Sequence, residues 1–143
     1  MTSLLLPDTN VWVALHHQRH AHHRVTLDWF NALNEQNTLI FCRQTQLEFF
    51  RLLTTSAVMG RETLTQRQCW ERYAQWLAGG RAIERSEPVG VREAFQSRTM
   101  AAEPAPKTWM DAYLSAFAET AQLTLVTFDK SLATKAKGAL LLG

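Results

Sequence analysis

The chain has 143 residues, of which 46% are hydrophobic and 20% are charged, the balance of an ordinary globular protein. Its length predicts one domain over residues 1–143, and its formal net charge of +2 is too small to indicate a nucleic-acid partner by itself. No apolar run reaches the ~20 residues of a membrane span, and no basic segment precedes a long apolar one. We therefore expect a cytoplasmic protein with no membrane partner and with reduced Cys42 and Cys69 thiols.

The first apolar segment, residues 4–6, predicts a short strand in a buried parallel sheet. Pro7 has no backbone N–H to donate, so it ends the strand. Asp8 then lies at the carboxyl end of the strand, the edge where open α/β sheets bind ligands. Thr9 and Asn10 are good N-cap residues, so we expect a helix to begin there.

All five histidines of the chain lie in the window 16–23. One interpretation is a metal site, because imidazole is a common metal ligand. The other is the polar start of a helix over about 21–36, capped by His20 or a neighbour. The window contains no cysteine or carboxylate and matches no closed zinc site, which favours the helix start.

The next segment predicts a strand over 38–42 and a helix over about 44–57. One stripe of this helix is polar and includes Glu48 and Arg51, whereas the residues around it are apolar. An ion pair between Glu48 and Arg51 one turn apart explains those two residues. It does not explain a polar stripe on a helix that otherwise faces the core, so Glu48 is a candidate site residue.

The middle of the chain is expected to form a third helix, an edge strand, a fourth helix and a loop, over residues 64–78, 82–84, 89–100 and 101–106. The third helix is expected to bury Trp70, Tyr73, Trp76 and Leu77.

The last third predicts a helix over 107–122 that is apolar nearly all round, as in a buried helix. Asp111 and Ser115 lie on its one stripe of small or polar residues. A strand over 123–127 follows, and Asp129 comes just after it, which repeats the position of Asp8. The chain is then expected to end with a short helix and a strand, over 131–137 and 139–142.

Alternating strands and helices predict an α/β fold with a mostly parallel sheet of four to five strands and helices on both faces. The carboxyl ends of parallel strands meet at one edge, so we expect Asp8, Glu48, Asp111 and Asp129 around one point. Carboxylates without histidine or thiolate favour Mg²⁺ or Mn²⁺, which serve hydrolysis of phosphate esters. The scattered Lys and Arg residues suit a phosphodiester substrate but are equally well explained as ordinary surface charge.

Four segments together resemble the PIN-domain ribonucleases, and among them the VapC-type toxins of type II toxin–antitoxin systems: Pro7–Trp12, Leu47–Thr54, Asp111–Ala118 and Leu125–Asp129. The resemblance implies a PIN-like fold and an Mg²⁺- or Mn²⁺-dependent endoribonuclease that cleaves structured RNA such as tRNA or rRNA. It also implies a homodimer that is neutralised by a cognate antitoxin protein.

The resemblance assigns Asp8, Glu48 and Asp111 as the three core acids, which are catalytic through the metal that they bind, and Asp129 as a more variable fourth. The supporting residues are expected to hold the acids or the ion, with Arg51 either orienting Glu48 or touching phosphate; they are Thr9, Asn10, Arg51, Ser115 and Thr127. Whether one or two ions bind is left open.

Two other functions remain as alternatives. A haloacid-dehalogenase-like phosphatase would use Asp8 as a covalent nucleophile, but it needs a second Asp two residues on, where this chain has Asn10. A catalytically silent PIN-like module would only bind RNA or a partner protein, and the presence of all four acids argues against it.

Overall fold

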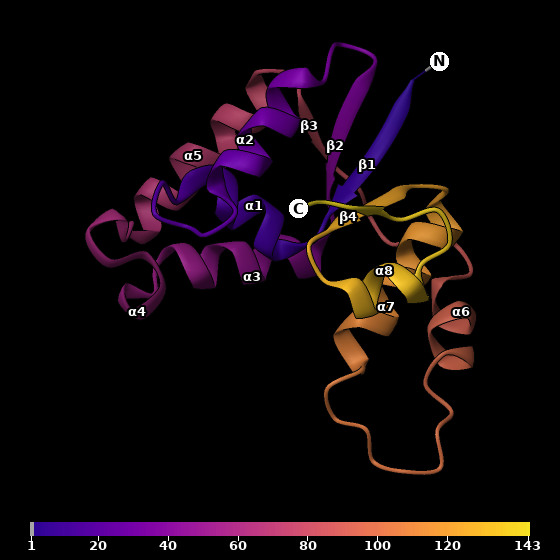
Figure 1. Cartoon of the computed structure of the whole chain (residues 1–143). Coiled ribbons are helices and arrows are strands. Elements are labelled where there is room, and N and C mark those ends of the chain that lie inside the picture. The colour runs from indigo at the N-terminus through magenta and orange to yellow at the C-terminus, as the bar shows by residue number, and fades with distance from the viewer. Residues whose placement is uncertain (1) are drawn as a thin grey trace.

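The computed structural model describes residues 2–143 and centres on a five-stranded parallel sheet (Figure 1). The strand order is β3-β2-β1-β4-β5, and every neighbouring pair is parallel. The strands are β1 (Ser3–Pro7), β2 (Asn37–Phe41), β3 (Ala82–Glu84), β4 (Thr124–Thr127) and β5 (Leu140–Leu141). The predicted α/β fold and the edge position of residues 82–84 are confirmed.

Eight α-helices and one 3₁₀ turn connect the strands in the described part of the chain. They are α1 (Thr9–His16), α2 (His23–Ala32), α3 (Arg43–Leu53), α4 (Ser56–Met59), the 3₁₀ turn η1 (Gly60–Glu62), α5 (Gln66–Ala78), α6 (Val91–Ser97), α7 (Trp109–Ala121) and α8 (Lys130–Lys135). No helix within residues 2–143 has the length and apolar character that crossing a bilayer requires.

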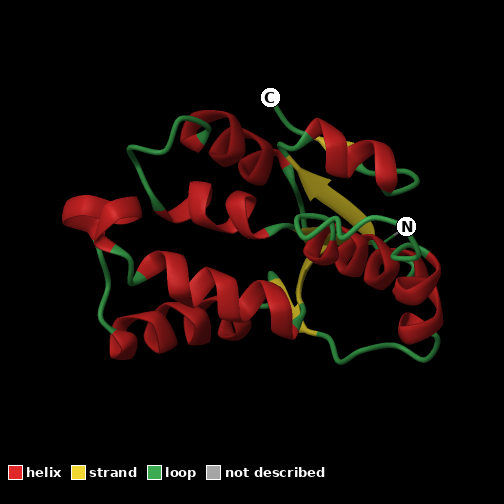
Figure 2. Cartoon of the chain, turned by 90° about the horizontal axis from the view of Figure 1, so that it is seen from below, coloured by secondary structure: helices red, strands yellow, loops and turns green. Residues whose placement is uncertain are grey.

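A separate hydrophobic core covers each face of the sheet. Successive residues of a strand point to opposite faces, so Leu5 joins the core under α1, α3 and α5, whereas Leu6 joins the core under α7. In the first core Trp12 stacks on Phe41 with ring centroids 3.8 Å apart. Figure 2, seen from the side on which the strands end, shows helices around the sheet, as predicted.

Several helices are shorter than the sequence predicts. Helix α2 ends at Ala32, and α3 ends at Leu53 before the separate short helix α4. The hydroxyls of Thr54 and Thr55 donate to the carbonyls of Phe50 and Arg51, at 2.9 and 2.5 Å. These side chains satisfy carbonyls at the end of the helix, which favours termination there.

The prediction that Trp70 is buried is wrong, because 57% of this residue is exposed. The buried face of α5 runs through Cys69 and Tyr73, four residues apart, and Trp70 lies about 100° away from Cys69 around the helix. Its ring instead packs edge-on against Phe50 at 4.8 Å. Helix α7 likewise begins with the exposed Trp109, so it is not buried all round.

Candidate active site

Asp8 lies directly after β1 and is 8% exposed. Its Oδ1 accepts hydrogen bonds from the backbone N–H groups of Asn10 and Val11, at 3.0 and 3.3 Å. Its Oδ2 accepts from the hydroxyl of Thr127 at the end of the neighbouring strand β4. Asp8 is therefore itself the N-cap of α1, in place of the predicted Thr9 or Asn10, because its carboxylate reaches the free N–H groups of the first turn.

Burial is the main reason why the pKa of Asp8 is raised above its ordinary value, and the negative charge of Asp111 adds to it. The three hydrogen bonds that the carboxylate accepts act in the opposite direction. Asp8 is thus a fixed, poorly hydrated carboxylate with a second acid close enough to repel it.

Asp111 and Asp129 lie on the same side of the sheet. Asp111 is half-buried in the first turn of α7, and burial followed by the charge of Asp129 raises its pKa, while Lys135 opposes the rise. Asp129 is the N-cap of α8 and accepts from the N–H of Ser131 at 2.8 Å. The backbone N–H of Asp129 donates to the Thr127 hydroxyl at 3.0 Å, so this one hydroxyl links Asp8 to Asp129.

Glu48 is held apart from this group of three acids. Its carboxylate pairs with Arg51 at 2.8 Å on α3, and it is not among the groups that shift the pKa of Asp8 or Asp111. It lines a hollow of about 450 Å³ between α3 and α7, together with Met110, the neighbour of Asp111. Three of the four predicted acids therefore lie near one another, whereas Glu48 lines a hollow that the other three acids do not line.

The PIN-domain family model matches residues 5–138. This chain belongs to the PIN-domain family. It is 42% identical to ribonuclease VapC41 of Mycobacterium tuberculosis over 130 residues, which cover 88% of this chain and 89% of that protein.

Solved structures that share the fold of this PIN-domain protein include two from bacterial toxin systems. Mycobacterium tuberculosis VapC20, a sarcin–ricin-loop-cleaving toxin, matches with a TM-score of 0.65 and 14% identity over 91% of this chain and 93% of the other. VapBC2 of Rickettsia felis bound to a DNA fragment from its promoter matches with a TM-score of 0.62 and 12% identity over 96% of each chain.

The acids of this PIN-domain protein suit a hard divalent cation in donor type, since they offer only carboxylate oxygens. The raised pKa values of Asp8 and Asp111 also favour a bound cation, because a cation would relieve the repulsion that contributes to them. These carboxylates do not form a preformed metal site, however. Within residues 2–143, no three His, Cys, Asp or Glu side chains lie close enough together to hold one ion.

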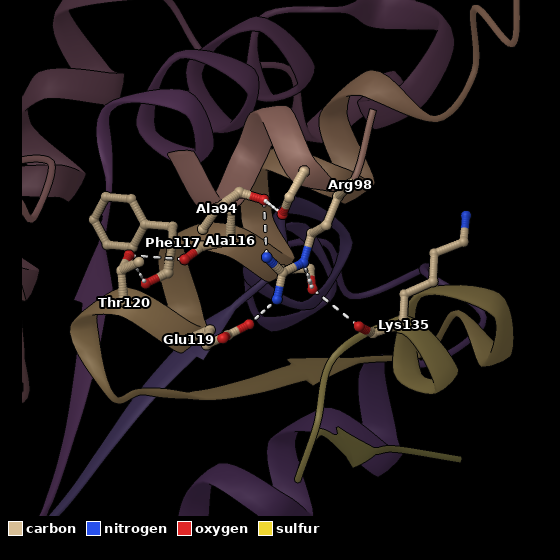
Figure 3. A network of polar contacts seen from close by, with 9 residues as sticks. Ala94, Arg98, Ala116, Phe117, Glu119, Thr120 and Lys135 are labelled. Carbon is tan, nitrogen blue, oxygen red and sulfur yellow. Dashed lines mark hydrogen bonds and ion pairs between the residues drawn. The ribbon is translucent and has the colours of Figure 1, made fainter. Parts of the chain in front are cut away.

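Ser115 does not contact the acids that we expected it to support. Its buried hydroxyl donates to the backbone carbonyl of Lys135 at 3.0 Å and accepts from Nε of Arg98 at 3.2 Å. Figure 3 shows Arg98 reaching from α6 towards α7, where it also bonds the Glu119 carboxylate. Ser115 therefore links α7 to Arg98 at the end of α6 and to Lys135 at the end of α8.

The histidine window shows no closed metal site in the part of the chain that the structure describes. Helix α2 begins at His23, later than predicted, and its N-cap His22 makes no side-chain hydrogen bond. The backbone N–H of His22 donates to Nδ1 of His20 at 3.0 Å, so the side chain of His20 caps the turn that leads into the helix. The ring of His22 stacks on Phe128 at 4.3 Å, and His20 stacks on the same ring at 6.2 Å. The window thus packs against the turn between Thr127 and Asp129, a contact that the sequence pattern did not indicate.

Proposed function

We propose that this PIN-domain protein is a divalent-metal-dependent endoribonuclease and the toxin of a toxin–antitoxin pair. The proposed substrate is structured RNA such as tRNA or rRNA, and the reaction is hydrolysis of its phosphodiester bonds. The observation that carries the proposal is the group of Asp8, Asp111 and Asp129 at one edge of the sheet, in a chain 42% identical to a ribonuclease.

Asp8, Asp111 and Asp129 would hold Mg²⁺ or Mn²⁺ once their side chains turn towards one another, with Glu48 as a fourth ligand once it leaves Arg51. That ion pair is exposed to solvent, so breaking it costs little. The chemistry that such an ion supplies when bound is activation of water and polarisation of phosphoryl oxygens.

The hydrogen bonds of Asp8 favour a role in orienting a metal ion and its bound water. Its carboxylate oxygens already accept three hydrogen bonds, from Asn10, Val11 and Thr127, which keep the side chain in one position. These bonds argue against a free nucleophile of the haloacid-dehalogenase type, which also requires an acid at the position of Asn10. We therefore assign the attack on phosphorus to a water molecule that approaches from the side opposite the leaving 3′ oxygen. The leaving oxygen takes its proton from solvent.

The test is cleavage of total RNA with Mg²⁺, Mn²⁺ or a chelator. We expect cleavage with either ion and none with the chelator. Asp8→Asn should lower the rate by more than about 100-fold, since even groups that only orient a metal ligand are worth 10–100-fold. Asp28→Asn is the matched control, because Asp28 is an exposed acid on α2 whose ion pair within residues 2–143 is with the exposed Arg24.

Full activity of Asp8→Asn with metal present would refute the assignment of Asp8. A wild-type protein that neither cleaves RNA nor binds Mn²⁺ would instead indicate a silent binding module.

The proposed partners are a cognate antitoxin and a second copy of the chain. The hollow beside Glu48 supports the first, because the apolar side chains of Leu47 and Met110 are largely exposed there. An antitoxin segment that covers them would also block Glu48. We expect the protein of the neighbouring gene to co-purify with this chain and to abolish cleavage, and light scattering to give the mass of two chains for the free toxin.

A further inference from the structure

A second hollow, of about 320 Å³, lies at the far end of α1 from Asp8. The eight residues of α1 span roughly 12 Å, so this hollow is separate from the acids. Its wall is formed by the ends of α1 and α5 and by the residue that precedes β3, and the side chains that matter are His16, Arg72, Trp76 and Arg81. Helices α2 and α5 meet beside it, where Phe30 contacts Trp76 edge-on at 5.3 Å (Figure 1).

Arg81 has hydrogen-bond donors that nothing in residues 2–143 satisfies. Its Nε and Nη2 atoms are both buried and have no acceptor. The guanidinium carbon lies 4.3 Å from the centre of the Phe30 ring, so the charge has a cation–π contact but these donors lack an oxygen. Buried polar groups are nearly always hydrogen-bonded, because a buried donor without an acceptor loses its water and gains nothing in return.

The other groups of the hollow do not supply that oxygen. No Asp or Glu lines it, and neither Arg72 nor Arg81 forms an ion pair among the described residues 2–143. Both ring nitrogens of His16 are occupied, one by the indole N–H of Trp76 at 2.8 Å and the other by the carbonyl of Trp12 at 2.8 Å. The hollow therefore carries two guanidinium charges and no anion.

We propose that this hollow binds the phosphate group of a nucleotide or of an RNA strand. Two guanidinium groups match the charge of a phosphate better than that of a single carboxylate, and the arginine fork favours oxyanions. The volume accommodates more than the phosphate alone, and Trp76 forms part of its wall. The site is independent of the proposed nuclease activity, because none of its residues belongs to the group of acids.

The experiment is calorimetric titration of the full chain. The buffer contains a chelator, so that phosphate cannot bind through a metal ion held by the acids. The probes are inorganic phosphate, adenosine 5′-monophosphate, a ten-nucleotide RNA and acetate, and the Asp8→Asn protein is used for the RNA. We expect the three phosphate probes to bind, and Arg81→Gln and Arg72→Gln each to weaken binding at least tenfold. Arg81→Lys keeps the charge without the planar guanidinium group, so its affinity for phosphate should fall between those of wild type and Arg81→Gln.

Arg67→Gln is the matched control, since Arg67 is exposed on α5 and does not line the hollow. Thermal unfolding checks that each variant folds, and phosphate should raise the midpoint of wild type but not of Arg81→Gln. Tighter binding of RNA than of the mononucleotide would identify RNA as the source of the phosphate, and equal binding would identify the free nucleotide.

Three results would overturn the proposal: no binding of any phosphate probe, acetate binding as tightly as phosphate, or equal binding by wild type and both glutamine variants. Loss of RNA cleavage in Asp8→Asn has no bearing on this outcome, so the two proposals fail separately.

Discussion

His16 links the stability of this protein to pH. The indole N–H of Trp76 can only donate, so Nε2 of His16 must be unprotonated, and Nδ1 carries the hydrogen that is donated to the Trp12 carbonyl. Protonation of Nε2 would break the bond to Trp76 and place a charge in a poorly hydrated position. Burial, and after it the charge of Arg72, accordingly lowers the pKa of His16 from 6.5 to about 4.

The size of the effect follows from this shift. Because the pKa is lower in the folded than in the unfolded chain, the unfolded chain binds the proton more tightly. The contribution of neutral His16 to stability is complete above about pH 6.5 and is lost as the pH falls from 6.5 towards 4. At 1.36 kcal/mol for each pKa unit, the loss amounts to ~3 kcal/mol.

The assay is urea unfolding of wild type and His16→Gln at intervals from pH 8 to pH 4. Glutamine can accept from Trp76 and donate to Trp12 but does not titrate, and other groups contribute equally to both proteins. The difference in free energy of unfolding should be constant above pH 7 and move by ~3 kcal/mol in favour of the variant by pH 4. A difference that does not change with pH would refute the assignment of a neutral, buried His16.

Two further predictions concern the acids. Asp8→Asn should raise the unfolding midpoint in chelator at pH 7, because asparagine keeps the N-cap and removes a carboxylate charge whose pKa is raised by burial and by Asp111. Differential scanning calorimetry should show this gain shrinking as the pH falls and the Asp8 carboxylate of wild type takes up a proton. Thr127→Val should lower RNA cleavage about 10–100-fold by removing the hydroxyl that joins Asp8 to Asp129, whereas Thr127→Ser should retain activity; equal rates for the two variants would contradict a role for the hydroxyl.

The fold was largely predictable because its signals are local. Apolar runs such as residues 4–6 and 123–127 mark buried strands, and a carboxylate two residues after each run, Asp8 or Asp129, marks the edge at which the strands end. Helix ends were less predictable. The end of α3 depends on the hydroxyls of Thr54 and Thr55, which can bond to the helix or to water, and the sequence does not say which.

Contacts between distant segments were not predictable in the same way. Ser115 and Asp111 share one stripe of α7, and the pattern suggested one role for both. In the folded chain Ser115 faces Arg98 and Lys135, whereas Asp111 faces Asp129. Which neighbour a polar side chain meets depends on how α6 and α8 pack against α7, and periodicity within one helix carries no information about that packing.

The sequence by itself determined the order of strands and helices along the chain, the parallel sheet and the placement of Asp8 and Asp129 at its carboxyl edge, because each follows from local apolar patterns and from the geometry of parallel connections. Only the tertiary structure decided that one hydroxyl, from Thr127, joins Asp8 to Asp129, and that Glu48 pairs with Arg51. It also decided that Arg81 is buried without an acceptor. These features depend on burial and on distances between segments far apart in the chain, which no local pattern encodes.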